Sequence, residues 1–110
     1  MAHNKPEPLT ESYFFILLCL YRGPSHGYGI MQEALTLSGG NVRIGSGTMY
    51  GATSNMMKKG WIEECPATDG FDRKRQYRLT EVGRQVLMDE IARLRYLNRA
   101  AEHVTGGMEL

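Results

Sequence analysis

The pattern of apolar and polar positions predicts a helical chain whose first helix is apolar on every side. An apolar run covers residues 13–21, between a cap at Thr10 or Ser12 and an end near Arg22. In a domain this small, a helix without a polar face must contact the core on one side and a partner on another. The first helix therefore predicts both a core and an interface.

A second, amphipathic helix is predicted next. Residues 28–37 carry apolar side chains on one face only, and Ser25 or His26 can open the helix. The glycine pair at 39–40 is expected to stop it.

A third helix follows a short loop. Ser46 is expected to cap it, and it runs to about Lys59 with Gly60 just beyond its end. Its buried stripe, spaced by three and four residues, is Met49, Ala52 and Met56.

The C-terminal half predicts a hairpin and one long helix. Residues 61–65 and 76–79 have the composition of two strands, joined by a loop over 66–75. Thr80 can cap a helix that continues past Ala101. Its apolar stripe is Leu87, Ile91, Leu94, Leu97, Ala101 and Val104.

This order of elements predicts a mainly α fold with a small β-hairpin: a winged helix-turn-helix plus a long C-terminal dimerisation helix. We expect a flexible tail over residues 1–8, the winged helix-turn-helix domain over 9–80, the dimerisation helix over 81–105 and a frayed tail over 106–110. A chain of 110 residues has room for one such core.

Composition further indicates a locally basic segment and a cytoplasmic location. The formal net charge is only +1, but residues 58–78 hold six basic against four acidic side chains, which suits an anionic partner. No signal peptide is visible, and the apolar run at 13–21 is too short to span a bilayer, so we expect a cytoplasmic protein without membrane contact. Cys19 and Cys65 are expected to be free thiols, with no metal and no cofactor.

Three motifs resemble those of the PadR family of winged-helix regulators. They are Gly-Pro-Ser-His-Gly-Tyr-Gly-Ile at 23–30, Gly-Thr-Met-Tyr at 47–50 with Lys-Gly-Trp-Ile at 59–62, and Arg-Gln-Tyr-Arg-Leu-Thr-Glu-Val-Gly at 75–83. The resemblance covers about residues 9–105, in the family's order. It implies a bacterial, cytoplasmic homodimer that binds double-stranded operator DNA, represses a neighbouring gene and is released by a small aromatic or cationic effector.

The third helix departs from the family pattern. Ser46 and Gly51 stand where the family has proline, Thr53 where it has leucine, and Asn55 where a basic residue is frequent. Thr53 and Asn55 are therefore expected to alter base readout, and Gly51 to cost about 1 kcal/mol of helix stability relative to alanine.

The candidate DNA-binding residues lie mainly on the polar side of the third helix. Short polar side chains can bond base edges, and groups near a helix start can bond phosphates. The candidates here are Ser46, Thr48, Tyr50, Ser54, Asn55 and Lys58. Tyr28 is a further candidate, because this end of a helix-turn-helix lies near the DNA backbone. The alternative is a merely solvated face, with Tyr28 used in packing.

The wing supplies three more candidates. Arg73, Lys74 and Arg75 end the hairpin loop and can contact phosphates without regard to sequence. The alternative is an exposed charged loop that discourages edge pairing. For the whole chain, the alternative function is a winged helix that binds protein without direct DNA contact. The sequence holds no catalytic constellation, so we expect no enzyme.

The dimer interface is expected on the first and last helices, at Phe14, Phe15, Leu18, Leu87, Ile91, Leu94, Leu97 and Ala101. Tyr96 is the candidate for an effector pocket between subunits, since the resemblance implies that aromatics there flank an apolar chamber; the alternative is an ordinary packing or surface tyrosine. Trp61 is expected to pack at the root of the wing and not to form a ligand platform.

Overall fold

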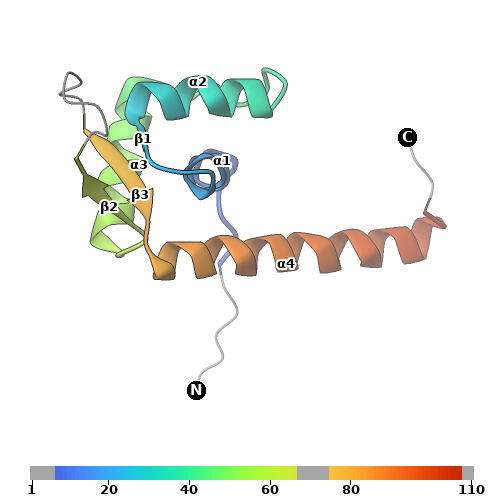
Figure 1. Ribbon diagram of the computed structural model, residues 1–110. Helices are drawn as coiled ribbons and strands as arrows, with labels where there is room; N and C mark the ends of the chain where they lie inside the picture. The colour runs from blue at the N-terminus through green and yellow to red at the C-terminus, as the bar shows by residue number, and fades with distance from the viewer. Residues whose placement is uncertain (1–6, 67–74, 108–110) are drawn as a thin grey trace.

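Four helices and a small antiparallel sheet make up the described part of the chain (Figure 1). The computed structural model describes residues 7–66 and 75–107. In order, the elements are α1 (Glu11–Tyr21), β1 (Ser25–His26), α2 (Gly27–Leu37), α3 (Ser46–Lys58), β2 (Ile62–Cys65), β3 (Gln76–Leu79) and α4 (Glu81–Thr105). The predicted series of three helices, a hairpin and a long last helix is confirmed.

Threonine side chains cap two of the helices. Thr10 caps α1 by accepting a hydrogen bond from the Tyr13 N–H at 3.1 Å. Thr80 caps α4 in the same way, accepting from the Gly83 N–H at 3.0 Å. Both caps satisfy N–H groups that the first turn of a helix leaves without an intrahelical partner.

The boundaries of α3 follow its glycines. The prediction that Ser46 caps α3 is wrong by one residue, because Gly45 occupies the cap position and makes no side-chain hydrogen bond. At the other end Gly60 has a φ of +76°, in the left-handed region that glycine adopts without steric cost. The Trp61 N–H then bonds back to the Met56 carbonyl at 2.9 Å, which closes the helix.

A third strand enlarges the predicted hairpin. The strand order is β1-β3-β2, with Ile62 opposite Leu79 and Cys65 opposite Gln76 in the hairpin. On the other edge, β1 places His26 opposite Gln76. Because β1 leads directly into α2, the sheet ties the start of α2 to the wing.

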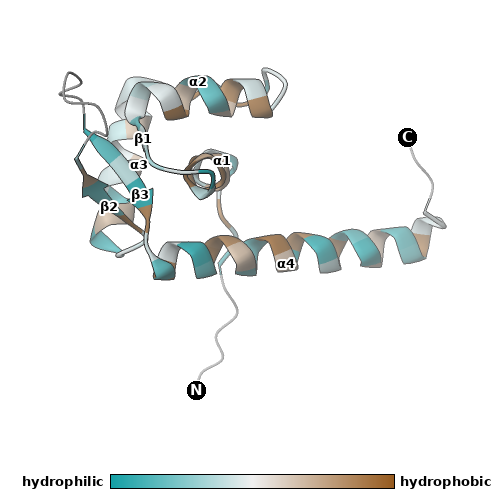
Figure 2. Cartoon of the chain, viewed as in Figure 1, coloured by the Kyte–Doolittle hydropathy of each residue, from teal (hydrophilic) through white to brown (hydrophobic). Residues whose placement is uncertain are grey.

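The core forms where α1 lies between α2 and α4 (Figure 1). The brown, hydrophobic side of α2 in Figure 2 is turned toward α1. The largest fully buried side chains are Ile16, Leu17, Cys19, Ile30, Met56 and Leu87. They come from all four helices, so a single core holds the domain together.

The last helix, α4, extends beyond the rest of the domain. Its first turns pack under α1 and β3, where Gly83, Leu87 and Glu90 are buried. Every residue from 94 to 107 is exposed, and the helix projects well beyond the other elements in Figure 1. The apolar side chains on the second half of this 25-residue helix are therefore not covered by their own domain.

Candidate nucleic-acid interface

One face of α3 belongs to the core and the opposite face is free. The buried side chains are Met49, Ala52, Thr53 and Met56. Helical periodicity places Gly47, Gly51, Ser54 and Lys58 on the other side. Gly47, Gly51 and Lys58 are exposed and Ser54 is half-buried, so this strip is available to a ligand.

Because Gly47 and Gly51 have no side chains, the backbone of α3 is accessible on its outward face. A Cβ added at Gly47 or Gly51 would meet no atom within 4 Å, so nothing inside the domain requires glycine there. Glycine in a helix interior costs roughly 0.5–1 kcal/mol relative to alanine. An outside surface that must approach the helix backbone closely would account for them.

Thr53 does not face outward, and the prediction that it alters base readout is wrong. It is 3% exposed, and its hydroxyl donates to the carbonyls of Met49 at 3.0 Å and Tyr50 at 3.1 Å. These bonds satisfy the hydroxyl inside the helix, so the polar side chain fits the buried stripe.

Asn55 lies toward α1 instead of outward. It is half-buried, and its Nδ2 donates to the Tyr13 hydroxyl at 3.0 Å. The amide donor expected to bond a base edge is therefore engaged within the domain. The role of Asn55 in base readout stays a prediction without support from this geometry.

Tyr28 and Tyr50 flank a shallow hollow beside α3. Tyr28 is 60% exposed and Tyr50 is 70% exposed. The hollow holds about 320 Å³ and includes Met31, Met49 and Ser46 in its walls. The structure thus brings three of the predicted residues, Ser46, Tyr28 and Tyr50, to one place at the starts of α2 and α3.

His26 fixes the start of α2 beside this hollow. Its Nδ1 accepts a hydrogen bond from the Gly29 N–H at 3.1 Å, which makes it the cap that the sequence left open between Ser25 and His26. A Cβ at Gly29 would lie 2.8 Å from the Ser25 hydroxyl, so the chain is tightly folded here. The His-Gly-Tyr-Gly motif therefore has a structural role in orienting Tyr28.

The cations of α3 and the wing differ in whether a carboxylate already pairs with them. Lys58 is exposed and has no carboxylate partner among the described residues. Arg75 pairs with Glu64 across the wing at 3.1 Å, with 65% of its side chain exposed. Arg73 and Lys74 lie outside the described residues, so the predicted wing cluster is placed only at Arg75.

A second cross-strand pair stiffens the wing. Arg78 donates to the Glu63 carboxylate at 2.7 Å, and this hydrogen bond raises the pKa of Arg78 further above its ordinary value. The two partners face each other in register on β3 and β2. The pair fixes the strands without using the outer face of α3.

The predicted interface residues separate into three groups by burial. Leu87 is fully buried in its own subunit and Ile91 packs against the same core, so the prediction that Leu87 meets a partner is wrong. Phe14, Phe15 and Leu18 are half-buried. The exposed members of the predicted set are Leu94, Leu97 and Ala101.

Tyr96 points away from this stripe. It lies nine residues after Leu87, or about two and a half turns, so the two side chains leave opposite sides of α4. Its exposed fraction is 56%. A role in a pocket between subunits remains a prediction that this orientation does not favour.

Glu90 is a buried acid that pattern reasoning missed. It is 3% exposed and receives two hydrogen bonds from Arg93, at 2.8 and 2.7 Å, and one from the Leu9 N–H at 3.3 Å. The bonds from Arg93 hold the pKa of Glu90 below its ordinary value despite the opposing effect of burial. The signal in the sequence was a charged residue three positions after Leu87, in phase with the apolar stripe.

The Cys19 thiol adds no reactive group to this face. Burial raises the pKa of Cys19 to about 11, so the thiol stays protonated at neutral pH. The described residues contain no group of three metal-ligating side chains, and no helix among them is long and apolar enough to cross a membrane.

Solved structures share this fold over most of its length. A PadR family transcription regulator from Clostridium difficile R20291 has a TM-score of 0.71 and 20% identity, covering 87% of this chain and 99% of its own. A transcriptional regulator from Clostridium thermocellum has a TM-score of 0.70 and 22% identity, covering 83% and 89%. Bacillus subtilis PadR, solved in complex with operator DNA, has a TM-score of 0.63 and 25% identity, covering 72% of this chain and 45% of its own.

The sequence itself matches a family over most of its length. No curated protein matches the chain. The profile of the transcriptional regulator PadR-like family matches residues 16–89, from α1 to the first turns of α4. Since this match spans more than half of the sequence, the chain belongs to the PadR-like family of transcriptional regulators.

Proposed function

We propose that this protein binds double-stranded DNA through the outward face of α3, with the start of α2 and the wing on either side. The observation that carries the proposal is the exposed strip of α3, which has two glycines that the domain does not need and no role in the core. The similar Bacillus subtilis PadR was solved with operator DNA bound, which supports the same use of the fold here.

Phosphate contacts are assigned to the start of α3 and base readout to its middle. The Ser46 and Thr48 hydroxyls lie in its first turn, where free N–H groups and the helix dipole favour phosphate. Tyr50 and Ser54 follow one and two turns later on exposed or half-buried positions, within reach of base edges. With no side chains at Gly47 and Gly51, the helix can lie deep in the major groove.

Charged contacts with the DNA phosphates are assigned to Lys58 and the wing. No carboxylate among the described residues pairs with Lys58, so its ammonium can bond a DNA phosphate directly. Arg75 would have to leave Glu64 in order to bond a phosphate. Such contacts raise affinity for any DNA sequence and weaken as salt increases. Arg73 and Lys74 retain their predicted role at the wing tip.

The active unit is assigned as a homodimer. The face of α4 that is buried at Leu87 continues outward as Leu94, Leu97, Ala101 and Val104, beyond the reach of its own domain. A second copy offers the same stripe and would place two α3 helices on one DNA duplex. We further propose that the regulator represses a neighbouring gene and responds to a small effector, as the resemblance implies.

Selection of duplexes from a random pool tests DNA recognition directly. A dimeric helix-turn-helix should enrich a two-fold symmetric sequence with half-site centres about 10 base pairs apart. A pool that shows no enrichment over the starting DNA would contradict the proposal and favour a protein-binding winged helix.

A further inference from the structure

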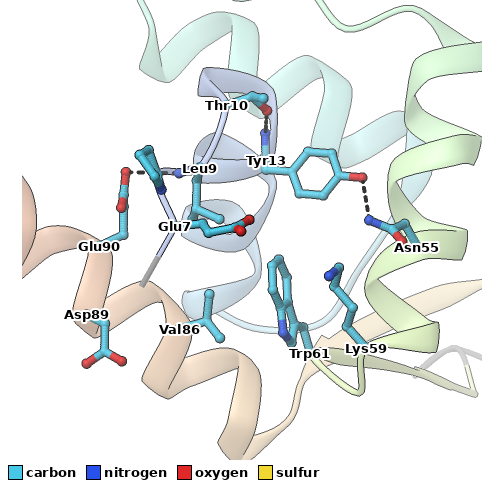
Figure 3. A pocket seen from close by; sticks show the side chains of 11 residues that line it. Glu7, Leu9, Thr10, Tyr13, Asn55, Lys59, Trp61, Val86, Asp89 and Glu90 are labelled. Carbon is cyan, nitrogen blue, oxygen red and sulfur yellow. Dashed lines mark hydrogen bonds between the residues drawn. The ribbon is translucent and has the colours of Figure 1, made fainter. Parts of the chain in front are cut away.

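A cavity lies where the segment before α1, the end of α3, the root of the wing and α4 meet (Figure 3). Its volume is about 500 Å³, enough for a small organic molecule. It shares no lining residue with the hollow between Tyr28 and Tyr50. Tyr96 does not line this cavity either.

Two aromatic rings give the cavity a flat, apolar lining. Tyr13 and Trp61 meet edge to face, with ring centroids 6.4 Å apart and an interplanar angle of 89°. Val86 and Leu9 add aliphatic surface. A planar ring that enters between these groups would find one face to stack on and one edge to contact.

One side of the cavity offers hydrogen-bond donors. The Tyr13 hydroxyl accepts from Asn55 at 3.0 Å, so its own proton is left to donate. The Lys59 ammonium lies 5.5 Å from the centroid of the Trp61 ring and has no carboxylate partner among the described residues. This side therefore suits a carboxylate or another anionic acceptor.

The other side offers acceptors. Figure 3 shows the Glu7 carboxylate directed into the space in front of Tyr13 and Trp61, with Asp89 further along α4. Glu7 forms no ion pair within the described part of the chain. The other two acids in the walls are already engaged: Arg93 and the Leu9 N–H bond Glu90, and the Gln85 amide donates to Asp89 at 2.8 Å. Glu7 therefore suits a cationic amine.

We propose that this cavity is a binding site for a small planar aromatic that carries a carboxylate at one end and an amine at the other. The carboxylate would bond Lys59 and the Tyr13 hydroxyl, the ring would pack on Trp61, and the amine would face Glu7. A ligand with only one of these charges would leave the opposite side of the cavity without its partner. Binding itself is independent of DNA, while its use as a signal rests on the proposed function.

Trp61 provides the readout, because it is the only tryptophan in the chain. The full chain is titrated with para-(aminomethyl)benzoate while Trp61 fluorescence and the shift of its indole N–H resonance are followed. Benzoate and benzylamine, which each keep one charge and the same ring, are the matched probes. We expect saturable binding of the first and at least about tenfold weaker binding of the other two, since each loses a charge-assisted contact.

Two neighbouring lysines supply the variant and its control. Lys59→Met removes the ammonium from the cavity and should weaken binding about tenfold or more, whereas Lys58→Met changes an exposed residue that does not line it. Thermal unfolding of both variants confirms that they fold. Absence of saturable binding at millimolar concentration, equal affinity for all three probes, or equal losses in the two lysine variants would overturn the proposal. None of these outcomes bears on DNA binding, which is measured without the probe.

Discussion

His26 shows how one side chain fixes a helix start. Its imidazole accepts the Gly29 N–H and replaces the bond that the first turn of α2 cannot make for itself. We predict that His26→Ala lowers the free energy of unfolding by about 1 kcal/mol, and that His26→Asn retains most of it because asparagine also caps well. Urea unfolding of the three proteins measures this, and equal stability of all three would contradict the capping role.

Gly83 and Gly51 are both helical glycines, but they serve different purposes. A Cβ at Gly83 would lie 1.9 Å from the Trp61 carbonyl oxygen, so α4 could not pack on the wing root, whereas one at Gly51 would meet no atom within 4 Å. We predict that Gly83→Ala destabilises the fold by about 1–3 kcal/mol or more, while Gly51→Ala stabilises it by roughly 0.5–1 kcal/mol. Thermal unfolding compares the pair; a harmless Gly83→Ala would refute the close approach.

Glu90 predicts a defined pH dependence. Its folded-state pKa is lowered, chiefly by the hydrogen bonds from Arg93, so its stabilising effect is present above the unfolded-state pKa of about 4.3. That effect is lost as the pH falls through the folded-state value. Glu90→Gln should therefore remove part of the acid-side loss of stability seen in the wild type. Unfolding curves from neutral to acid pH test this, with the exposed Glu102→Gln as control; identical acid profiles for wild type and Glu90→Gln would contradict it.

Single residues were the hardest to place from sequence. The apolar spacing of α3 defines the centre of its buried stripe but not the width of that stripe. Thr53 enters the stripe because its hydroxyl bonds back to Met49 and Tyr50, and Asn55 turns inward because Tyr13 lies within reach. Both partners depend on the folded helix or on α1, so composition alone could not show them.

The helices themselves could be predicted because each has a strong local signal. Periodic apolar positions set their faces, and caps or glycines set their ends, as at Thr10, Gly60 and Thr80. The two-residue strand β1 was missed, since it is too short for any alternation and exists only because β3 lies beside it. Its pairing is a tertiary effect that no local pattern encodes.

The apolar stripe of α4 predicts how the subunits associate. Ala101 continues the face that is buried at Leu87, whereas Ala92 lies on the opposite side of the helix, and both are exposed in one subunit. In the proposed dimer, Ala101→Asp would bury an unpaired charge and should raise the dimer dissociation constant at least about tenfold. Ala92→Asp should leave it unchanged.

Sedimentation of the two variants at micromolar concentration makes this comparison. A wild-type monomer at that concentration, or equal weakening by both substitutions, would contradict the assigned interface.

At the scale of the whole molecule, the sequence indicated a winged helix with a projecting helix but not the cavity at their junction. Its walls come from three distant segments, at 7–13, 55–61 and 86–90. Trp61 illustrates the point, because it lies at the wing root as expected and yet also presents its ring to a cavity. Only the packing of α1 and the wing against α4 brings these residues together.

The outward face of α3 as the DNA-binding surface is the central claim, and binding of fluorescent duplexes tests it most directly. The wild type, Tyr50→Ala and Tyr96→Ala are titrated with the duplex enriched from a random pool and with its scrambled sequence. Tyr50 and Tyr96 are exposed tyrosines, 70% and 56%, on α3 and α4. We predict that Tyr50→Ala loses about 1–3 kcal/mol on the enriched duplex and that Tyr96→Ala binds like the wild type. Wild-type affinity in Tyr50→Ala, or equal losses in both variants, would contradict the account.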